Sequence, residues 1–226
     1  MKILALETST EFCSVALWQD GKLSQTLQNV GQKHSEILMS MLDTLLQEND
    51  VKLSQLDGIA FGAGPGSFTG VRIACGVAQG LALGANLPVI GISTLLALAQ
   101  ATDASKVISA LDARMAEVYF AAYEKRDGQW LAVCEPCLCL PQHTPRLAGE
   151  GWLGAGSGFA AHGALIQAQY PGQISNIEAG SIPQASAIAA LAGPMFAAGL
   201  GGDAAQAMPV YLRDKVALKT SERLAL

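Results

Sequence analysis

Hydrophobic and polar residues alternate along the first hundred positions in patterns that predict a series of short elements. Apolar residues 3–6 indicate a buried strand, and alternating segments on either side of Asp20–Gly21 indicate a β-hairpin. Residues 34–49 carry large apolar side chains at three- and four-residue spacing, which is typical of a helix with one apolar face. A strand over 56–61, a helix over 69–85, a strand over 89–92 and a helix over 95–101 follow.

The second half of the chain repeats this order less clearly. A strand over 107–111 leads to a hairpin around Asp127–Gly128, a further strand runs into a glycine loop at 151–158, and helices are predicted over 159–169 and 183–198. A three-stranded meander followed by alternating helices and strands is the order of an RNase-H-like unit. We therefore predict an α/β fold of two tandem RNase-H-like lobes with actin-like ATPase (ASKHA-type) architecture. The lobes are predicted at 1–103 and 104–226, with segment 208–226 returning to the first lobe.

Residues 62–72, Gly-Ala-Gly-Pro-Gly-Ser-Phe-Thr-Gly-Val-Arg, join a predicted strand to a predicted helix. Glycine permits close backbone approach, Ser67 or Thr69 can cap the helix, and the N–H groups of a helix start attract anions. The spacing is not that of a Walker A motif, because no lysine precedes either hydroxyl residue. A structural turn is therefore favoured over a phosphate site, and both stay open. The candidates for anion or nucleotide contact are Glu7 at the end of the first strand, Gly64, Gly66, Ser67, Thr69 and Arg72.

Composition and charge narrow the classes of function. Half of the residues are hydrophobic and 15% are charged, which indicates a packed globular protein. The net charge of −5 argues against a protein that grips a nucleic acid unaided. The uncharged run 73–102 is broken by Gly84–Pro88 into pieces shorter than the roughly 20 residues of a membrane span. Because the first seven residues are also too polar for a signal peptide, we expect a cytoplasmic protein without membrane contact.

The cysteines and histidines give little support for a metal site. The odd number of five cysteines without a secretory signal favours reduced thiols. Cys134, Cys137, Cys139 and His143 resemble a ligand cluster, but no second cysteine pair exists and no two histidines stand four residues apart. Small buried hydrophobic side chains are the favoured interpretation. No metal ligand and no catalytic residue is assigned.

Two predicted helices carry a candidate subunit interface. In the helix over 69–85, glycine recurs every four residues, and each glycine in a helix interior costs up to about 1 kcal/mol relative to alanine. Such a face suits close approach by another backbone, either from the protein's own sheet or from a second subunit. The helix over 34–49 adds an apolar stripe with adaptable methionines. The predicted interface residues are Ile37, Leu38, Met41, Leu45, Gly76, Gly80 and Gly84.

Several short motifs lie along nearly the whole chain and together resemble one family. They are Glu7-Thr-Ser9, His34-Ser-Glu36, Gly64-Pro-Gly-Ser-Phe-Thr-Gly-Val-Arg72, Asp112-Ala-Arg114 with Glu117-Val-Tyr119, and Pro209-Val-Tyr-Leu-Arg213. The chain resembles the TsaB (YeaZ) family of bacterial tRNA threonylcarbamoyladenosine biosynthesis proteins. It departs from the usual pattern at Met115, where a second basic residue is common, which weakens anion binding by that loop.

The resemblance implies a role within an assembly. It implies a homodimer in isolation, a heterodimer with the related transferase TsaD, and work with the P-loop ATPase TsaE. This assembly moves a threonylcarbamoyl group from its adenylate to N6 of the adenosine beside the anticodon (t6A), in tRNAs that read codons beginning with A, so tRNA is reached through the complex. The family pairs through its first two helices, which correspond to residues 35–49 and 69–85.

The resemblance also bears on catalysis. The family lacks the paired metal-binding histidines of TsaD, and no His-x3-His occurs in this sequence. A non-catalytic scaffold that activates the transferase is therefore predicted. It has no tightly bound cofactor, and ATP or ADP is expected only at an interface shared with partner subunits. The alternative is an enzyme active by itself, either an actin-like ATPase or kinase or a peptidase.

Overall fold

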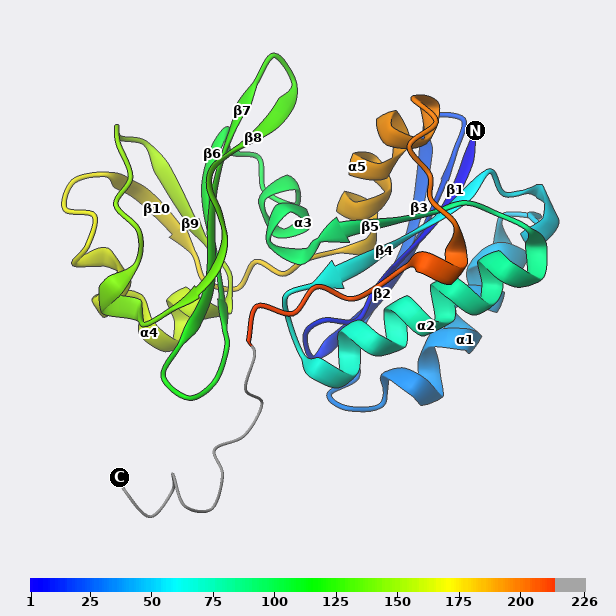
Figure 1. Ribbon diagram of the computed structural model, residues 1–226, viewed down its shortest axis with the longest axis horizontal. Helices are drawn as coiled ribbons and strands as arrows, with labels where there is room; N and C mark the ends of the chain where they lie inside the picture. Colours follow the sequence, from blue (N-terminus) through cyan, green and yellow to red (C-terminus); the bar gives the residue numbers. More distant parts are fainter. Residues whose placement is uncertain (214–226) are drawn as a thin grey trace.

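The computed structural model describes residues 1–213 of the 226-residue chain as two lobes, each built on a five-stranded sheet (Figure 1). The first sheet has the strand order β3-β2-β1-β4-β5 and the second the order β10-β9-β6-β7-β8. In both sheets an antiparallel meander of three strands is continued by two parallel strands. This repeated topology confirms the predicted α/β fold of two RNase-H-like lobes.

The elements follow the predicted order closely along the chain. The strands of the first sheet are β1 (Lys2–Glu7), β2 (Phe12–Gln19), β3 (Lys22–Asn29), β4 (Gly58–Gly64) and β5 (Val89–Ser93). The strands of the second sheet are β6 (Lys106–Asp112), β7 (Val118–Arg126), β8 (Gln129–Cys139), β9 (Trp152–Ala155) and β10 (Ile174–Glu178). The helices are α1 (His34–Glu48), α2 (Phe68–Ala85), α3 (Thr94–Gln100), α4 (Ser157–Gln167) and α5 (Ala185–Ala197), with 3-10 turns at Leu53–Gln55, Pro141–His143 and Ala204–Gln206.

The first sheet is covered on both faces, because side chains of a strand alternate between the two sides. Leu4 and Leu6 of β1 pack with α1 and α2 on one face, and Ile3 and Ala5 pack with α5 on the other. Figure 1 shows α1 and α2 side by side below this sheet, with α5 above it. The central strands are therefore continuously apolar, which is the pattern of a strand buried on both faces.

Helix α5 packs against a different lobe from the one predicted. The sequence division at 103/104 assigns residues 185–197 to the second lobe, whereas α5 packs against β1, β2 and β4 of the first lobe. The ring of Trp18 lies where a side chain on Gly193 would stand, 2.9 Å from the position of a Cβ atom, and Ala185 N–H donates to Ser14 Oγ over 2.9 Å. The helix also begins at Ala185, so Pro183 precedes its first turn.

Helix α3 connects the two lobes (Figure 1). Its Ala97 packs with α5 in the core of the first lobe, while Leu95 and Leu98 pack with Val107 of β6 and Tyr123 of β7 in the second. The side chain of Gln100 at its end accepts a hydrogen bond from Trp130 Nε1 of β8 over 2.6 Å. The lobes thus share one buried helix between their sheets.

Helix α2 is 18 residues long and apolar enough to cross a membrane by length and composition alone. It lies against β4, however, with Ala74, Ala78 and Ala82 fully buried in the core of the first lobe. The apolar run ends at the predicted break, where Asn86 adopts a left-handed conformation (φ 54°) as the C-cap. These contacts are those of a core helix in a soluble protein.

Candidate functional site

The loop between β4 and α2 lies at the carboxyl end of the first sheet, where α/β proteins usually bind ligands. Ser67 is the N-cap of α2, and its Oγ accepts the Gly70 N–H over 3.4 Å, which confirms Ser67 as a predicted cap. The Ser67 N–H in turn donates to Ser9 O over 2.8 Å. Thr69 stands exposed in the first turn of the helix. Hydrogen bonds to residues of the same chain therefore fix the start of α2.

Three glycines of this loop lie directly on residues 7–9, which follow β1. A Cβ atom on Gly62 would overlap the carboxylate of Glu7, and one on Gly70 would overlap the carbonyl oxygen of Thr8. A Cβ atom on Gly66 would stand 2.6 Å from the Cβ atom of Ser9. These positions require glycine because side-chain or backbone atoms of residues 7–9 occupy the space beside them. The glycine pattern is thus accounted for by packing inside the protein.

Glu7 is sealed beneath this loop. Its side chain is 1% exposed, Oε1 accepts the Ser9 N–H over 2.5 Å, and Oε2 has no hydrogen-bond partner. Burial raises the pKa of the Glu7 carboxyl, against the smaller opposing effect of the hydrogen bonds from Ser9 and Thr8. A carboxyl group that is desolvated and covered by Gly62 does not offer an open lone pair to a metal ion. The predicted contact of Glu7 with an anion or nucleotide would therefore require the loop to move.

Arg72 has an aromatic environment at the outer end of the loop. Its guanidinium group lies 3.6 Å from the ring centroid of Phe68, and its Nε donates to the hydroxyl of Tyr211 over 2.6 Å. Within residues 1–213, no carboxylate lies within 4.0 Å of Arg72. Stacking on an aromatic face leaves the other donors of the guanidinium group free for an acidic or anionic group. Among the predicted anion contacts, Arg72 carries the positive charge, and it presents free donors at the surface.

Residues 207–213 form a C-terminal strap that crosses from the first lobe to the second, and Figure 1 shows it below α3. The Val210 N–H donates to Ala63 O over 2.7 Å, and Val210 O lies 2.8 Å from where a Cβ atom on Gly64 would stand. Gly64 has a φ of +106°, a conformation that favours glycine. The strap therefore contacts the first lobe at Val210, and residues 214–226 of the segment predicted to return there lie outside the described part.

The far end of the strap holds the loop between β6 and β7. Arg213 donates to Glu117 Oε2 over 2.7 Å and to Ala113 O over 3.0 Å. In this loop Asp112 and Arg114 form an ion pair, with 3.2 Å between Oδ2 and Nη1. Residues 114–116 all have positive φ angles, between 54° and 61°, which costs roughly 1–2 kcal/mol for each non-glycine residue. The strap therefore stabilises a strained loop of the second lobe.

The predicted interface residues divide into two groups. Positions 76, 80 and 84 are exposed, and a Cβ atom on any of these glycines would meet no atom within 4 Å. The three large side chains Leu38, Met41 and Leu45, by contrast, belong to the core beneath α1 and are 0–4% exposed. These three side chains are therefore not available to a second subunit, because the apolar stripe of α1 faces its own sheet. The large apolar side chains exposed on the two helices are Met39, Phe68 and Leu83, and Ile37 reaches the surface in part.

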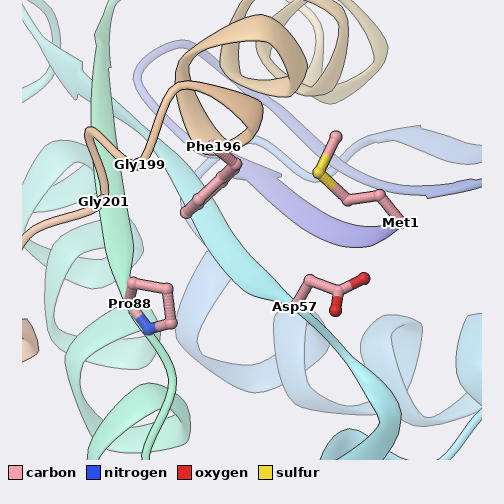
Figure 2. A pocket seen from close by; sticks show the side chains of 6 residues that line it. All are labelled: Met1, Asp57, Pro88, Phe196, Gly199 and Gly201. Carbon is pink, nitrogen blue, oxygen red and sulfur yellow. The ribbon is translucent and has the colours of Figure 1, made fainter.

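A hollow of about 480 Å³ lies at the opposite end of the first sheet (Figure 2). It is lined by Met1, Asp57, Pro88, Phe196, Gly199 and Gly201. Met1, Asp57 and Pro88 directly precede β1, β4 and β5, so the hollow lies away from the carboxyl ends of the parallel strands. Its one carboxylate, Asp57, already accepts the Lys2 N–H over 2.6 Å. No converging polar groups mark this hollow as a site.

The cysteines of β8 do not form a metal centre in the described structure. Over residues 1–213, no group of three or more histidine, cysteine, aspartate or glutamate side chains has an arrangement that would hold a metal ion. Cys134, Cys137 and Cys139 are half-buried on β8, and Cys13 and Cys75 are fully buried in the first lobe.

Two contacts of the strap were not predicted from the sequence. The Tyr211 hydroxyl meets Arg72 from 139 positions away, and Arg213 meets Glu117 from 96 positions away. Both belong to short motifs that mix aromatic and charged residues, but spacing along a chain does not say which distant loops meet. The sequence therefore contained the motifs without indicating the strap that joins them.

The same sheet topology occurs in both lobes, and helix α3 and the strap contact both of them. This architecture defines a class, the two-lobed actin-like (ASKHA-type) α/β proteins. The model of the family "TsaD: tRNA N6-adenosine threonylcarbamoyltransferase" matches residues 28–220. The chain is 40% identical to the tRNA threonylcarbamoyladenosine biosynthesis protein TsaB of Escherichia coli, and 37% identical to that of Haemophilus influenzae. The alignments cover 97% of this chain and 97% and 96% of those proteins.

Solved structures agree with these sequence relatives. The structure of YeaZ from Pseudomonas aeruginosa superposes with a TM-score of 0.85 at 40% identity, over 93% of this chain and 99% of that one. A second Pseudomonas aeruginosa structure, described as similar to peptidase YEAZ, gives a TM-score of 0.87 at 40% identity, over 94% and 99% of the two chains. The chain belongs to the TsaB family, as its motifs indicated.

Proposed function

We propose that this chain takes part in the biosynthesis of threonylcarbamoyladenosine in tRNA, as a non-catalytic subunit that activates a TsaD-like transferase. The E. coli and H. influenzae relatives are named for this pathway, and they match the chain over nearly its whole length. The transferase moves the threonylcarbamoyl group from its adenylate to N6 of the adenosine beside the anticodon. This chain contributes surface and stability to that assembly in the cytoplasm.

One observation carries the non-catalytic role: the loop that would cradle a nucleotide is occupied by the protein itself. Residues 7–9 fill the space beside Gly62, Gly66 and Gly70, and the strap lies against Gly64. An actin-like ATPase needs an accessible acid for Mg²⁺ and open phosphate-binding loops. Glu7, the acid at the matching position, is buried with an unpaired oxygen. A tightly bound nucleotide is therefore not expected, and ATP or ADP would bind only where a partner completes the site.

The partners are assigned to the open face of α2. Exposed glycines at positions 76, 80 and 84 let a second helix approach the α2 backbone closely, and Leu83 on α2 and Met39 on α1 are exposed apolar side chains. The same face serves a homodimer in isolation and a heterodimer with the TsaD-like subunit, so the two assemblies compete. A TsaE-like ATPase and the tRNA join through the complex, because a chain of net charge −5 has little attraction for RNA on its own.

Calorimetric titration and reconstitution test this proposal together. The purified chain should show no heat of binding for Mg-ATP at micromolar concentrations and no ATP turnover. Adding it to the TsaD-like and TsaE-like subunits should raise tRNA modification at least tenfold over the same mixture without it. Micromolar Mg-ATP binding with steady turnover by the isolated chain would overturn the non-catalytic role. Full modification activity without this chain would overturn its part in the pathway.

A further inference from the structure

Arg72 and Asp203 carry opposite charges and lie at the two ends of the exposed side of α2. Arg72 contacts the ring of Phe68 and the hydroxyl of Tyr211, whereas Asp203 lies beside the last turn of the helix. Both residues are exposed. In the part of the chain that the structure describes, neither side chain forms an ion pair. Each residue therefore presents an unpaired charge at the surface.

A hollow of about 410 Å³, called here the α2 hollow, lies at the carboxyl end of α2 with Asp203 in its wall. Leu83, Asn86 and Leu87 line it from the end of the helix. The last turn of α2 contains no basic residue, so no cation of the helix offsets the negative end of its dipole. Asp203 Oδ1 accepts the Ala205 N–H over 2.9 Å, which leaves Oδ2 for another donor. The α2 hollow therefore suits a basic side chain whose apolar stem packs against the leucines.

Arg72 of the same chain cannot reach the α2 hollow. Fourteen positions separate Arg72 from Asn86, which corresponds to about 21 Å along a helix at 1.5 Å per residue. A second copy of the chain brings its Arg72 to the hollow when the two α2 helices run in opposite directions. Gly80 lies midway, eight positions after Arg72 and eight before Pro88, which also lines the hollow. A two-fold axis beside Gly80 therefore sets Arg72 of each copy opposite the hollow of the other.

We propose that the homodimer forms by antiparallel pairing of α2, with Arg72 of each copy bound in the α2 hollow of the other copy beside Asp203. This inference rests on the proposed function, which assigns the homodimer to the open face of α2, and it adds the orientation of the two copies and their polar contacts. Each contact is a hydrogen-bonded ion pair between the guanidinium group and the carboxylate. The two-fold symmetry forms this ion pair twice, once at each end of the paired helices.

Residues 201–213 place both parts of the contact on the same side of α2. This segment follows the helix from its end towards its start (Figure 1). Residues 201–204 line the α2 hollow, Ala207 O accepts a hydrogen bond from Gln79 Nε2 over 3.0 Å, and Tyr211 contacts Arg72. A two-fold axis that is perpendicular to α2 and lies in the plane of contact keeps this side of one copy next to the same side of the other. The cation of each copy therefore faces the hollow of the other.

Parallel pairing of the same face lacks this complementarity. It would place the two Arg72 side chains next to each other and the two Asp203 side chains next to each other, and juxtaposed like charges oppose association. Gly76 and Gly84 are each four positions from Gly80, so antiparallel helices set glycine opposite glycine and can approach closely. The charges and the glycines thus favour the same arrangement.

Charge reversal and charge exchange in the full-length chain test the contact. Arg72→Glu and Asp203→Arg should each raise the dissociation constant of the homodimer by about tenfold or more in sedimentation equilibrium. Asp203→Asn, which keeps an oxygen for the Ala205 N–H, should weaken the dimer in the same direction. The double variant Arg72→Glu/Asp203→Arg restores an opposite pair across the interface, so its dissociation constant should return to within about threefold of the wild-type value.

The matched control is Arg146→Glu, which makes the same change of charge at an exposed position of the second lobe and should dimerise as the wild type does. Circular dichroism of each variant shows that the fold is retained. A double variant that dimerises no better than the single variants would overturn the contact. A dimeric Arg72→Glu beside a monomeric Gly80→Leu would also overturn it, while leaving the α2 face as the interface. A dimeric Gly80→Leu would overturn the interface itself.

Discussion

Seven glycines lie between residues 62 and 84, and the first four differ sharply from the last three. At positions 62, 64, 66 and 70, a Cβ atom would stand within 3 Å of another part of the chain. At positions 76, 80 and 84, a Cβ atom would meet no atom within 4 Å. The same residue type therefore serves internal packing in the loop and leaves an open face on the helix.

This difference assigns separate roles to one continuous segment. The loop glycines allow α2 to pack closely against residues 7–9 and the strap. The loop therefore resembles a phosphate-binding loop in sequence, but in the structure its glycines serve packing within the chain. The helix glycines cost stability in the isolated chain, since alanine would fit at each of them without contact. A cost of that kind, on an exposed face, is consistent with close approach by a partner helix.

The largest effect is expected at the packed end of the segment. Gly70→Ala places a methyl group on the carbonyl oxygen of Thr8, which is backbone and cannot turn aside. The variant should lose about 3 kcal/mol or more of unfolding free energy, as for other overpacked core sites. Urea unfolding followed by circular dichroism measures this loss. A loss below about 0.5 kcal/mol would show that the loop is not packed as described.

A second effect concerns the carboxyl group sealed under the loop. The pKa of Glu7 is raised above the unfolded value of 4.5, so its protonated form stabilises the fold below pH 4.5, and this contribution is lost as the pH rises through the folded pKa. Glu7→Gln removes that dependence while keeping the shape of the side chain. Relative to the wild type, the variant should therefore gain stability in urea titrations as the pH rises from 4.5 through the folded pKa of Glu7, and the gain should level off above that pKa. Parallel stability curves for the two proteins over this range would contradict burial of the charged group.

A smaller effect is expected where the strap meets the second lobe. Arg213→Ala removes hydrogen bonds to Glu117 and to Ala113 O, from a side chain that is 14% exposed, and should cost about 1–2 kcal/mol of unfolding free energy. The matched control is Arg126→Ala, which breaks an ion pair with Glu124 from a side chain that is 63% exposed. The control should change stability by less than about 1 kcal/mol. Equal losses of unfolding free energy in the two variants would show that the strap does not stabilise the second lobe more than a surface ion pair does.

The smallest effect should have the opposite sign. Gly76→Ala adds a methyl group in open space and removes the flexibility of glycine from a helix interior, so the unfolding free energy should rise by up to about 1 kcal/mol. Urea unfolding of Gly76→Ala and Gly70→Ala at the same protein concentration compares the unfolding free energies of the two α2 variants. A loss of stability at position 76 would show that this face is packed within the chain.

The sequence predicted the elements well and their assembly only in part. The hairpin at Asp20–Gly21 and the caps of α2 depend on local chemistry, and they were placed to within a residue or two. The edge strand β10 was not predicted, because its alternation is weak and both neighbouring segments are polar. The division at 103/104 places helix α5 in the second lobe, whereas it packs on the sheet of the first, since it is apolar nearly all round and carries no stripe that selects one partner.

The candidate site shows the same limit. Periodicity found the apolar stripe of α1, but it could not tell whether Leu38, Met41 and Leu45 face a sheet or a second subunit, and they face the sheet. The glycine motif was recognised, yet its two possible roles stayed open because the segments that fill it lie far away along the chain. Contacts such as Arg72 with Tyr211 depend on tertiary structure, which local patterns do not contain.

The central claim is that the open face of α2 is the subunit interface, and Gly80→Leu tests it most directly. A Cβ atom at position 80 would meet no atom within 4 Å and the position is exposed, so the fold should be retained while the leucine side chain holds off a partner helix. Light scattering should show a dimer for the wild type and a monomer for Gly80→Leu. The matched control Gly163→Leu, on α4 of the second lobe, should remain a dimer. A Gly80→Leu protein that stays dimeric would contradict the claim.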